Sequence, residues 1–174
     1  MIINERDSRA ERVIAVGRQM LTAARTAPKA KGLDLLECCL LTGDDIVRLS
    51  EEMARLYDET GRPVFKRDGV NILKADCVVI IATHIRPMGL NCGHCGFPTC
   101  GDKPAQIPCA FNPTDIGIAL GSAVATAADL RVDTRVMYSA GIAAQRLNLL
   151  DGCALYFAIP VSASSKSPFF DRQP

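Results

Sequence analysis

Residues 85–113 read IRPMGLNCGHCGFPTCGDKPAQIPCAFNP, a stretch dominated by Gly, Pro and Cys and without apolar periodicity. A loop of this length inside a compact domain is usually functional or disordered. Its cysteines argue for a functional loop that is held together by something other than a hydrophobic core. They follow the spacing C-x2-C-x4-C-x8-C, at Cys92, Cys95, Cys100 and Cys109.

This spacing favours a metal centre. A C-x2-C pair lets two thiolates turn toward one centre, and Gly93 and Gly96 free the backbone to turn there, with amide N–H groups able to face sulfur. Soft thiolates without a carboxylate suit zinc or an iron–sulfur cluster. Structural zinc usually takes two separated cysteine pairs, whereas here one pair is followed by two single cysteines. An iron–sulfur cluster is therefore favoured over zinc, and either is favoured over a metal-free loop.

The remaining cysteines are interpreted as buried thiols. Cys38 and Cys39 are adjacent in an apolar stretch that is predicted to be a strand, and adjacent strand residues face opposite sides of a sheet. They cannot easily serve one site. Cys77 and Cys153 each begin an apolar stretch, so we expect them to behave as small hydrophobic side chains as well.

Around the loop, apolar periodicity predicts alternating helices and strands. A first helix is expected to begin at Asp7 or Ser8 and to end at Pro28. The further elements expected are strand 33–41, helix 44–59, helix 64–74, strand 76–83, helix 115–130, strand 132–137, helix 139–147 and strand 153–161. This order predicts an α+β fold, an α/β sandwich. The small residues of 115–130 indicate close packing in the core, with a cofactor-binding helix as the alternative.

Composition excludes several function classes. The net charge is +1, aromatic residues make up 5% of the chain and Trp is absent, so neither a nucleic-acid surface nor a membrane surface is expected. The longest apolar run, 77–83, is far shorter than a membrane span. No secretory signal is visible, so a cytoplasmic location is expected, where free thiols persist.

Two resemblances add to this interpretation. The string CGHCGFPTC at 92–100 resembles the CxxCGxxxC core of the four-cysteine [4Fe–4S] domain of corrinoid iron–sulfur proteins. There the fourth cysteine lies farther downstream, where this chain has Gly117. A closer resemblance, to the uncharacterised bacterial and archaeal ferredoxin-domain proteins, rests on NCGHCGFPTC, CAFNPTDIGIALGSAV, DTRVMYSAG and IPVSASSKSPFFDR. It implies that Cys109 is the fourth ligand.

That family in turn resembles a shortened nitroreductase, through TAARTAPKAKGLD, ADCVVIIAT and DIGIALGSAV. The resemblance implies one nitroreductase-like domain over 1–174, with 85–113 as an inserted iron–sulfur loop. Nitroreductases are α+β flavoproteins, usually homodimers with FMN at the subunit interface. Arg9 and Lys29 are the candidates for binding an anion or the FMN phosphate, with solvated surface charge as the alternative.

Two functions from different classes follow. The first is electron transfer or an oxidoreductase reaction through the cluster, with or without a flavin, to a redox partner protein or a small-molecule acceptor. The second is a non-enzymatic binding or sensing module whose zinc or cluster only folds the loop. In the C-terminal segment, Phe169 and Phe170 are expected to dock the tail on its own core. The alternative is a tail with Lys166 and Arg172 that closes a pocket or crosses to a second subunit.

Overall fold

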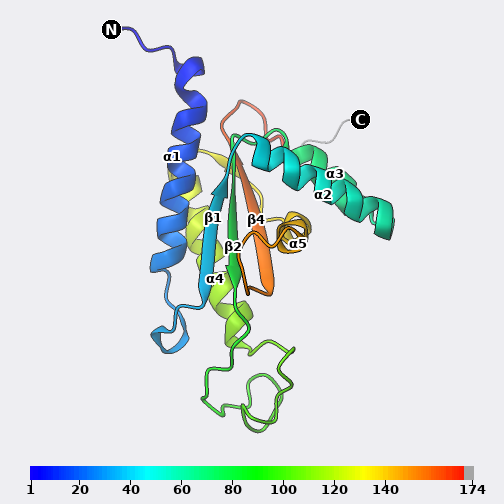
Figure 1. The fold of residues 1–174 in the computed structure, drawn as a ribbon. Coiled ribbons are helices and arrows are strands. Elements are labelled where there is room, and N and C mark those ends of the chain that lie inside the picture. Colours follow the sequence, from blue (N-terminus) through cyan, green and yellow to red (C-terminus); the bar gives the residue numbers. More distant parts are fainter. Residues whose placement is uncertain (171–174) are drawn as a thin grey trace.

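The computed structural model describes residues 1–170 of the chain (Figure 1). In chain order the elements are α1 (Glu5–Thr26), the 3-10 turn η1 (Ala30–Gly32), β1 (Leu36–Leu41), α2 (Asp44–Thr60), α3 (Pro63–Ile72), β2 (Cys77–Thr83), α4 (Phe111–Asp129), β3 (Asp133–Thr134), α5 (Tyr138–Arg146) and β4 (Leu155–Ser162). The predicted α+β fold is confirmed.

The strands form a sheet in the order β1-β2-β4-β3, and each neighbouring pair is antiparallel. The central strand β2 is buried along its whole length, as its Val- and Ile-rich sequence predicts. β3 is very short, and the strand expected over 132–137 is completed only by an isolated bridge from Met137 to Ala158.

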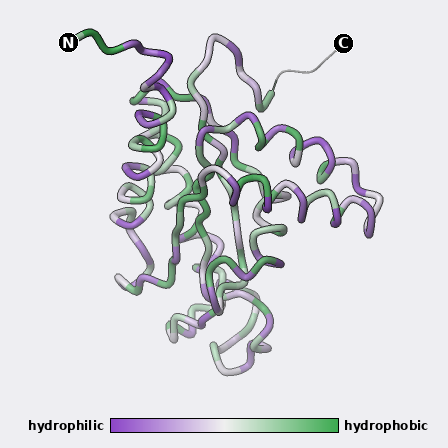
Figure 2. The backbone as a smooth tube through the Cα atoms, turned by 45° about the horizontal axis from the view of Figure 1, so that its top comes forward, coloured by the Kyte–Doolittle hydropathy of each residue, from purple (hydrophilic) through white to green (hydrophobic). Residues whose placement is uncertain are grey.

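Helices cover both faces of the sheet, α1 and α4 on one and α2, α3 and α5 on the other (Figure 1). Alternate residues of β2 divide between the two hydrophobic cores: Ile80 points to the core under α2 and α5, and Ile81 to the core under α1 and α4. Figure 2 shows hydrophobic residues gathered in the central strands and hydrophilic residues recurring along the outer helices. Burial between these layers is the main force that organises the scaffold.

The small-residue helix packs closely, as expected. Ala119, Ala123 and Ala127 of α4 are fully buried in the core shared with α1. The Ser122 hydroxyl donates a hydrogen bond of 3.0 Å to the carbonyl of Ala23 in α1. Small side chains on α4 therefore let the two helices approach one another over the sheet.

Some predicted boundaries were wrong. α1 begins earlier than Asp7 or Ser8, because the Asn4 side chain accepts the Arg6 N–H and caps the helix. α4 begins at Phe111 rather than Asp115, since Pro113 falls in the first turn, where a missing N–H costs nothing. For α2, by contrast, the predicted limits agree closely with the observed ones. Gly61, in the left-handed conformation, ends this helix.

The C-terminal segment docks on its own core through Phe169. This side chain is fully buried, and the Arg135 guanidinium donates to its carbonyl at 2.8 Å. The Arg135 guanidinium also lies 5.0 Å from the centroid of the Phe170 ring. Arg172 lies outside the described residues.

Over residues 1–170, none of the helices combines the length and apolar character that crossing a membrane requires.

Candidate functional site

The cysteine loop leaves the end of β2, forms a lobe below the sheet and returns as α4 (Figure 1). Between Thr83 and Phe111 the described chain contains neither helix nor strand. The predicted irregular loop is confirmed here, although its last residues belong to the first turn of α4.

The four predicted ligands line one small pocket. Cys92, Cys95, Cys100 and Cys109 meet there, and Phe97 and Phe111 contribute apolar walls. All four are free thiols, so the loop is not closed by disulfides. Within residues 1–170, no three His, Cys, Asp or Glu side chains form a group that could hold a metal ion. The four sulfurs therefore share a pocket without converging on a single point.

The turn between the first two cysteines has the expected backbone. Gly93 and Gly96 have φ angles of 68° and 87°, in the left-handed region that favours glycine. The Gly96 N–H donates to the Gly93 carbonyl at 2.9 Å rather than to a sulfur. The glycines thus shape the turn, while the main-chain donor to a loop sulfur comes from elsewhere.

That donor is Asn91, which sequence reasoning missed. Its main-chain N–H points to the Cys100 sulfur at 3.4 Å, and its side-chain oxygen accepts the Cys100 N–H at 2.8 Å. Its φ of 47° is left-handed, a conformation in which Asn is strongly enriched among non-glycine residues. An Asn directly before the first cysteine was the available signal.

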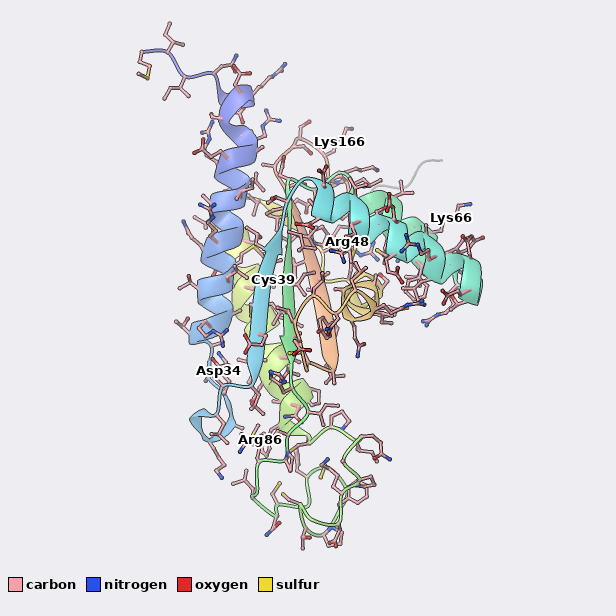
Figure 3. The ribbon with its side chains drawn as sticks, in the orientation of Figure 1. Asp34, Cys39, Arg48, Lys66, Arg86 and Lys166 are labelled. Carbon is pink, nitrogen blue, oxygen red and sulfur yellow. The ribbon has the colours of Figure 1, made fainter. Side chains whose placement is uncertain are left out.

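Asn112 was missed as well. Its buried side chain accepts the Cys109 N–H at 2.9 Å and the Arg86 N–H at 3.3 Å, and donates to the Arg86 carbonyl at 3.1 Å. Figure 3 shows Arg86 where the chain leaves the sheet and enters the lobe. One amide therefore joins the beginning of the loop to its last cysteine.

Two lysines also hold the loop. The Lys103 ammonium is buried and donates to the carbonyls of Pro104 and Ile107. The Lys31 ammonium, on η1, donates to the Met88 carbonyl at 2.9 Å. Both contacts tie carbonyl groups of the loop to a cationic side chain. His94, in the first cysteine pair, is exposed, and its ring lies 6.0 Å from the ring of Phe111.

The other cysteines lie in the cores, as predicted. Cys38 packs against the α1–α4 core and Cys39 against the core on the opposite face (Figure 3 labels Cys39 on β1). Burial raises the pKa of Cys38 and of Cys39 to about 11, that of Cys153 to about 11 and that of Cys77 to about 12. These thiols stay protonated at neutral pH, which makes them poor metal ligands.

The structure does not bring Arg9 and Lys29 together. Arg9 lies at the start of α1, where it lines an open pocket with Arg6, Ser164 and Ser165 and donates two hydrogen bonds of 2.7 Å to Glu5. These bonds lower the pKa of Glu5. Lys29 lies beyond the other end of α1, where its ammonium donates to the carbonyls of Ala24 and Arg25. One phosphate cannot contact both side chains.

Comparison with known proteins identifies the family. Residues 105–172 match the family model described as "Uncharacterized protein containing a ferredoxin domain (DUF2148)". An uncharacterised protein of Archaeoglobus fulgidus is 39% identical over 184 aligned positions, which cover 100% of this chain and 99% of that relative. The chain belongs to the ferredoxin-domain family. The matched region of this ferredoxin-domain protein contains Cys109 and Asn112.

Solved structures with a similar fold are nitroreductases and related oxidoreductases. An FMN-bound nitroreductase from Desulfitobacterium hafniense has a TM-score of 0.57 at 13% identity, over 95% of this chain and 92% of that chain. An FMN-dependent nitroreductase from Clostridium difficile gives 0.53 at 14% identity, over 87% and 76%. At these identities the likeness shows the fold alone: the ferredoxin-domain protein has a nitroreductase-like scaffold.

Proposed function

We propose that this ferredoxin-domain protein binds a [4Fe–4S] cluster through Cys92, Cys95, Cys100 and Cys109 and transfers electrons. The observation that carries the proposal is that these four free thiols, from different parts of an irregular loop, line one pocket. When bound, such a cluster supplies one-electron chemistry. The family description supports the same assignment.

The pocket fits a cluster better than a single zinc ion. A zinc ion requires four sulfurs at about 2.3 Å from one point. A four-iron cluster instead takes one thiolate at each iron, so its ligands stand farther apart around a larger body. The four cysteines line one pocket, and their spacing, one C-x2-C pair followed by two single cysteines, favours the second arrangement. Phe97 and Phe111 add apolar surface to the pocket, and the polarity around a cluster is one determinant of its potential.

Electron transfer is separated from a purely structural metal by one experiment. The anaerobically purified protein, reduced with dithionite, should pass about one electron per chain to an oxidised viologen dye. Protein stripped with a chelator should keep its far-ultraviolet circular dichroism and lose that transfer. If the loaded protein transfers no electrons, or holds zinc, the alternative of a non-enzymatic binding or sensing module is correct.

A flavin is the second candidate cofactor, and we propose the Arg9 pocket for its phosphate. Arg6 and Arg9 supply guanidinium groups suited to phosphate, and Ser164 and Ser165 supply hydroxyl donors from the far end of the chain. The FMN named for similar structures supports this assignment. The pocket lies at the opposite end of α1 from the cysteine loop (Figure 1), so the phosphate and the cluster would occupy separate sites.

Titration of the protein with FMN tests this site. Arg9→Ala should weaken FMN binding by about tenfold, because a charge-assisted phosphate contact is lost. Glu5→Gln should strengthen it, since Glu5 now competes for the same guanidinium. Lys29→Ala is the matched control and should have no effect. Equal affinities in all three variants would eliminate the Arg9 pocket.

We also propose a cytoplasmic homodimer that exchanges electrons with a partner protein or a small molecule. Free thiols throughout the chain fit a reducing compartment. The outer face of α4 supports self-association, because Ile118 is 42% exposed beside Gly121, whose open side meets no atom. Ile118→Glu should convert a dimer to a monomer in light scattering, whereas Val70→Glu, at an exposed apolar site on α3, should not. A monomeric wild-type protein would contradict the proposal.

A further inference from the structure

The cysteine loop contains two asparagines whose side chains bind the main chain of cysteines. Asn112 is only 1% exposed and satisfies both polar main-chain groups of Arg86, as a neighbouring strand would. Its oxygen also accepts the Cys109 N–H at 2.9 Å. Because Arg86 lies at the beginning of the loop and Cys109 is its last cysteine, this single amide closes the loop at its base.

Asn91 acts on a different cysteine, near the tip of the loop. Its side-chain oxygen fixes the Cys100 N–H at 2.8 Å, while its own N–H points to the Cys100 sulfur at 3.4 Å. Its left-handed backbone, with φ of 47°, is what lets both groups face the same residue. Asn91 therefore sets the direction of Cys100 and supplies a hydrogen bond to its sulfur.

We propose that Asn91 and Asn112 are positioning residues of the metal centre, which hold Cys100 and Cys109 in place before metal arrives. This inference rests on the proposed function. Between Thr83 and Phe111 the loop lacks helix, strand and disulfide. The cysteines are therefore held in fixed positions by such hydrogen bonds. Groups that orient metal ligands through hydrogen bonds typically change metal affinity by about 10- to 100-fold when they are removed.

The two residues have different consequences for reduction. An N–H donor directed at a sulfur ligand favours the more negative, reduced form of a cluster, so it raises the reduction potential. Asn91 supplies such a donor and Asn112 does not, because Asn112 binds the Cys109 main chain rather than its sulfur. The Asn91 donor is a main-chain N–H, which Asn91→Ala keeps, but that variant loses the side-chain acceptor that holds the N–H toward the Cys100 sulfur. Asn91→Ala should therefore weaken metal retention and lower the potential, and loss of Asn112 should mainly weaken retention.

The test uses the full chain loaded anaerobically with iron and sulfide. Asn91→Ala and Asn112→Leu should release iron to a chelator about tenfold faster than the wild type. Asn91→Ala should also have a more negative midpoint potential, and Asn91→Asp, which keeps the acceptor for Cys100, should restore slow release. Asn91 is exposed, so its variants test the proposal even if Asn112→Leu does not fold.

Two other asparagines are matched controls. Asn148 has nearly the same left-handed φ, 48°, and Asn71 is also buried, but both lie outside the loop. Asn148→Ala and Asn71→Leu should leave iron release unchanged. Release from the loop variants within about twofold of the wild type, or equal acceleration in the controls, would overturn the proposal.

A metal-free measurement keeps this result separate from the proposed function. If the wild-type chain takes up no iron, the proposed function fails, and amide hydrogen exchange in the metal-free chain still decides the role of the asparagines. Exchange at Cys100 should rise about tenfold in Asn91→Ala, and exchange at Cys109 in Asn112→Leu, with no change in the controls. Unchanged exchange in both variants would refute the positioning role.

Discussion

The α+β scaffold and the cysteine loop of this ferredoxin-domain protein contain four cysteines each, in opposite environments. Cys38, Cys39, Cys77 and Cys153 belong to cores built by burial, and that burial raises the pKa of each thiol. Cys92, Cys95, Cys100 and Cys109 line a pocket in a loop that is held by a few polar contacts. The same residue type is therefore a packing group in one region and a candidate ligand in the other.

The difference shows what each environment allows a thiol to do. Iron and zinc bind the thiolate, and a hydrophobic core makes a thiolate expensive to form. The four cysteines of the loop belong to neither hydrophobic core, and Cys92 is exposed. Position in the fold therefore distinguishes the four packed cysteines from the four candidate ligands.

The largest expected effect separates the two sets directly. Cys95→Ser should abolish the absorbance near about 400 nm and most of the bound iron, because one ligand is removed. Cys38→Ser should leave both unchanged, since this side chain packs in the α1–α4 core. Ultraviolet–visible spectra with iron analysis measure the two variants side by side. Equal losses in both would contradict the division of the cysteines.

The sheet region should be far less tolerant of added volume than the loop. A methyl group at Gly141 of α5 would meet the Tyr156 carbonyl oxygen of β4 at 2.1 Å, and main-chain atoms there cannot give way. Gly141→Ala should therefore lower the free energy of unfolding by about 3 kcal/mol. Gly101→Ala, in the loop, finds only ordinary contacts and should change it by less than about 0.5 kcal/mol. Thermal unfolding of both variants in the same buffer measures the difference. Similar losses of stability in the two variants would show that the loop is packed like a core.

The buried thiols should also make the scaffold sensitive to alkali. Burial raises the pKa of Cys77 from 9.0 to about 12, so the folded state favours the protonated thiol. This contribution to stability is complete below pH 9.0 and is lost as the pH rises through about 12. In Cys77→Ala the free energy of unfolding, measured by urea titration, should fall less steeply over this pH interval. The variant should also be less stable than the wild type at neutral pH. An unchanged pH dependence in the variant would show that Cys77 is not the titrating group.

The smallest effect concerns the contact between η1 and the loop. Lys31→Met removes the donor to the Met88 carbonyl, and Lys31 is exposed. The free energy of global unfolding should change by less than about 0.5 kcal/mol. Hydrogen exchange within the loop should nevertheless become faster, because the loop can open without unfolding the sheet. A large change in global stability would show that the two regions unfold together.

Local patterns in the sequence were enough to predict much of the scaffold. Ile46, Leu49 and Met53 recur at helical spacing, and Gly61 follows, so the limits of α2 could be predicted closely. The opposite facing of Cys38 and Cys39 follows from the two-residue period of a strand. The start of α1 was predicted too late, because Asn4, Asp7 and Ser8 are all good capping residues and only the folded chain selects among them.

The organisation of the candidate site was less predictable. The cysteine spacing marks the ligands, but Asn112 acts on Arg86, which is distant in sequence and has no periodic relation to it. Lys29 illustrates the converse. Its charge and its place in the motif suggested anion binding, yet the chain turns so that its ammonium meets the carbonyls at the end of α1. Contacts of this kind depend on tertiary geometry and have no signature in one sequence.

The most direct test of the central claim is quantitative iron and acid-labile sulfide analysis of the anaerobically reconstituted chain. We predict about four irons and about four sulfides per chain, with these values lost on Cys95→Ser. Stoichiometric zinc, or fewer than about two irons per chain, would contradict the assignment of a [4Fe–4S] cluster to Cys92, Cys95, Cys100 and Cys109.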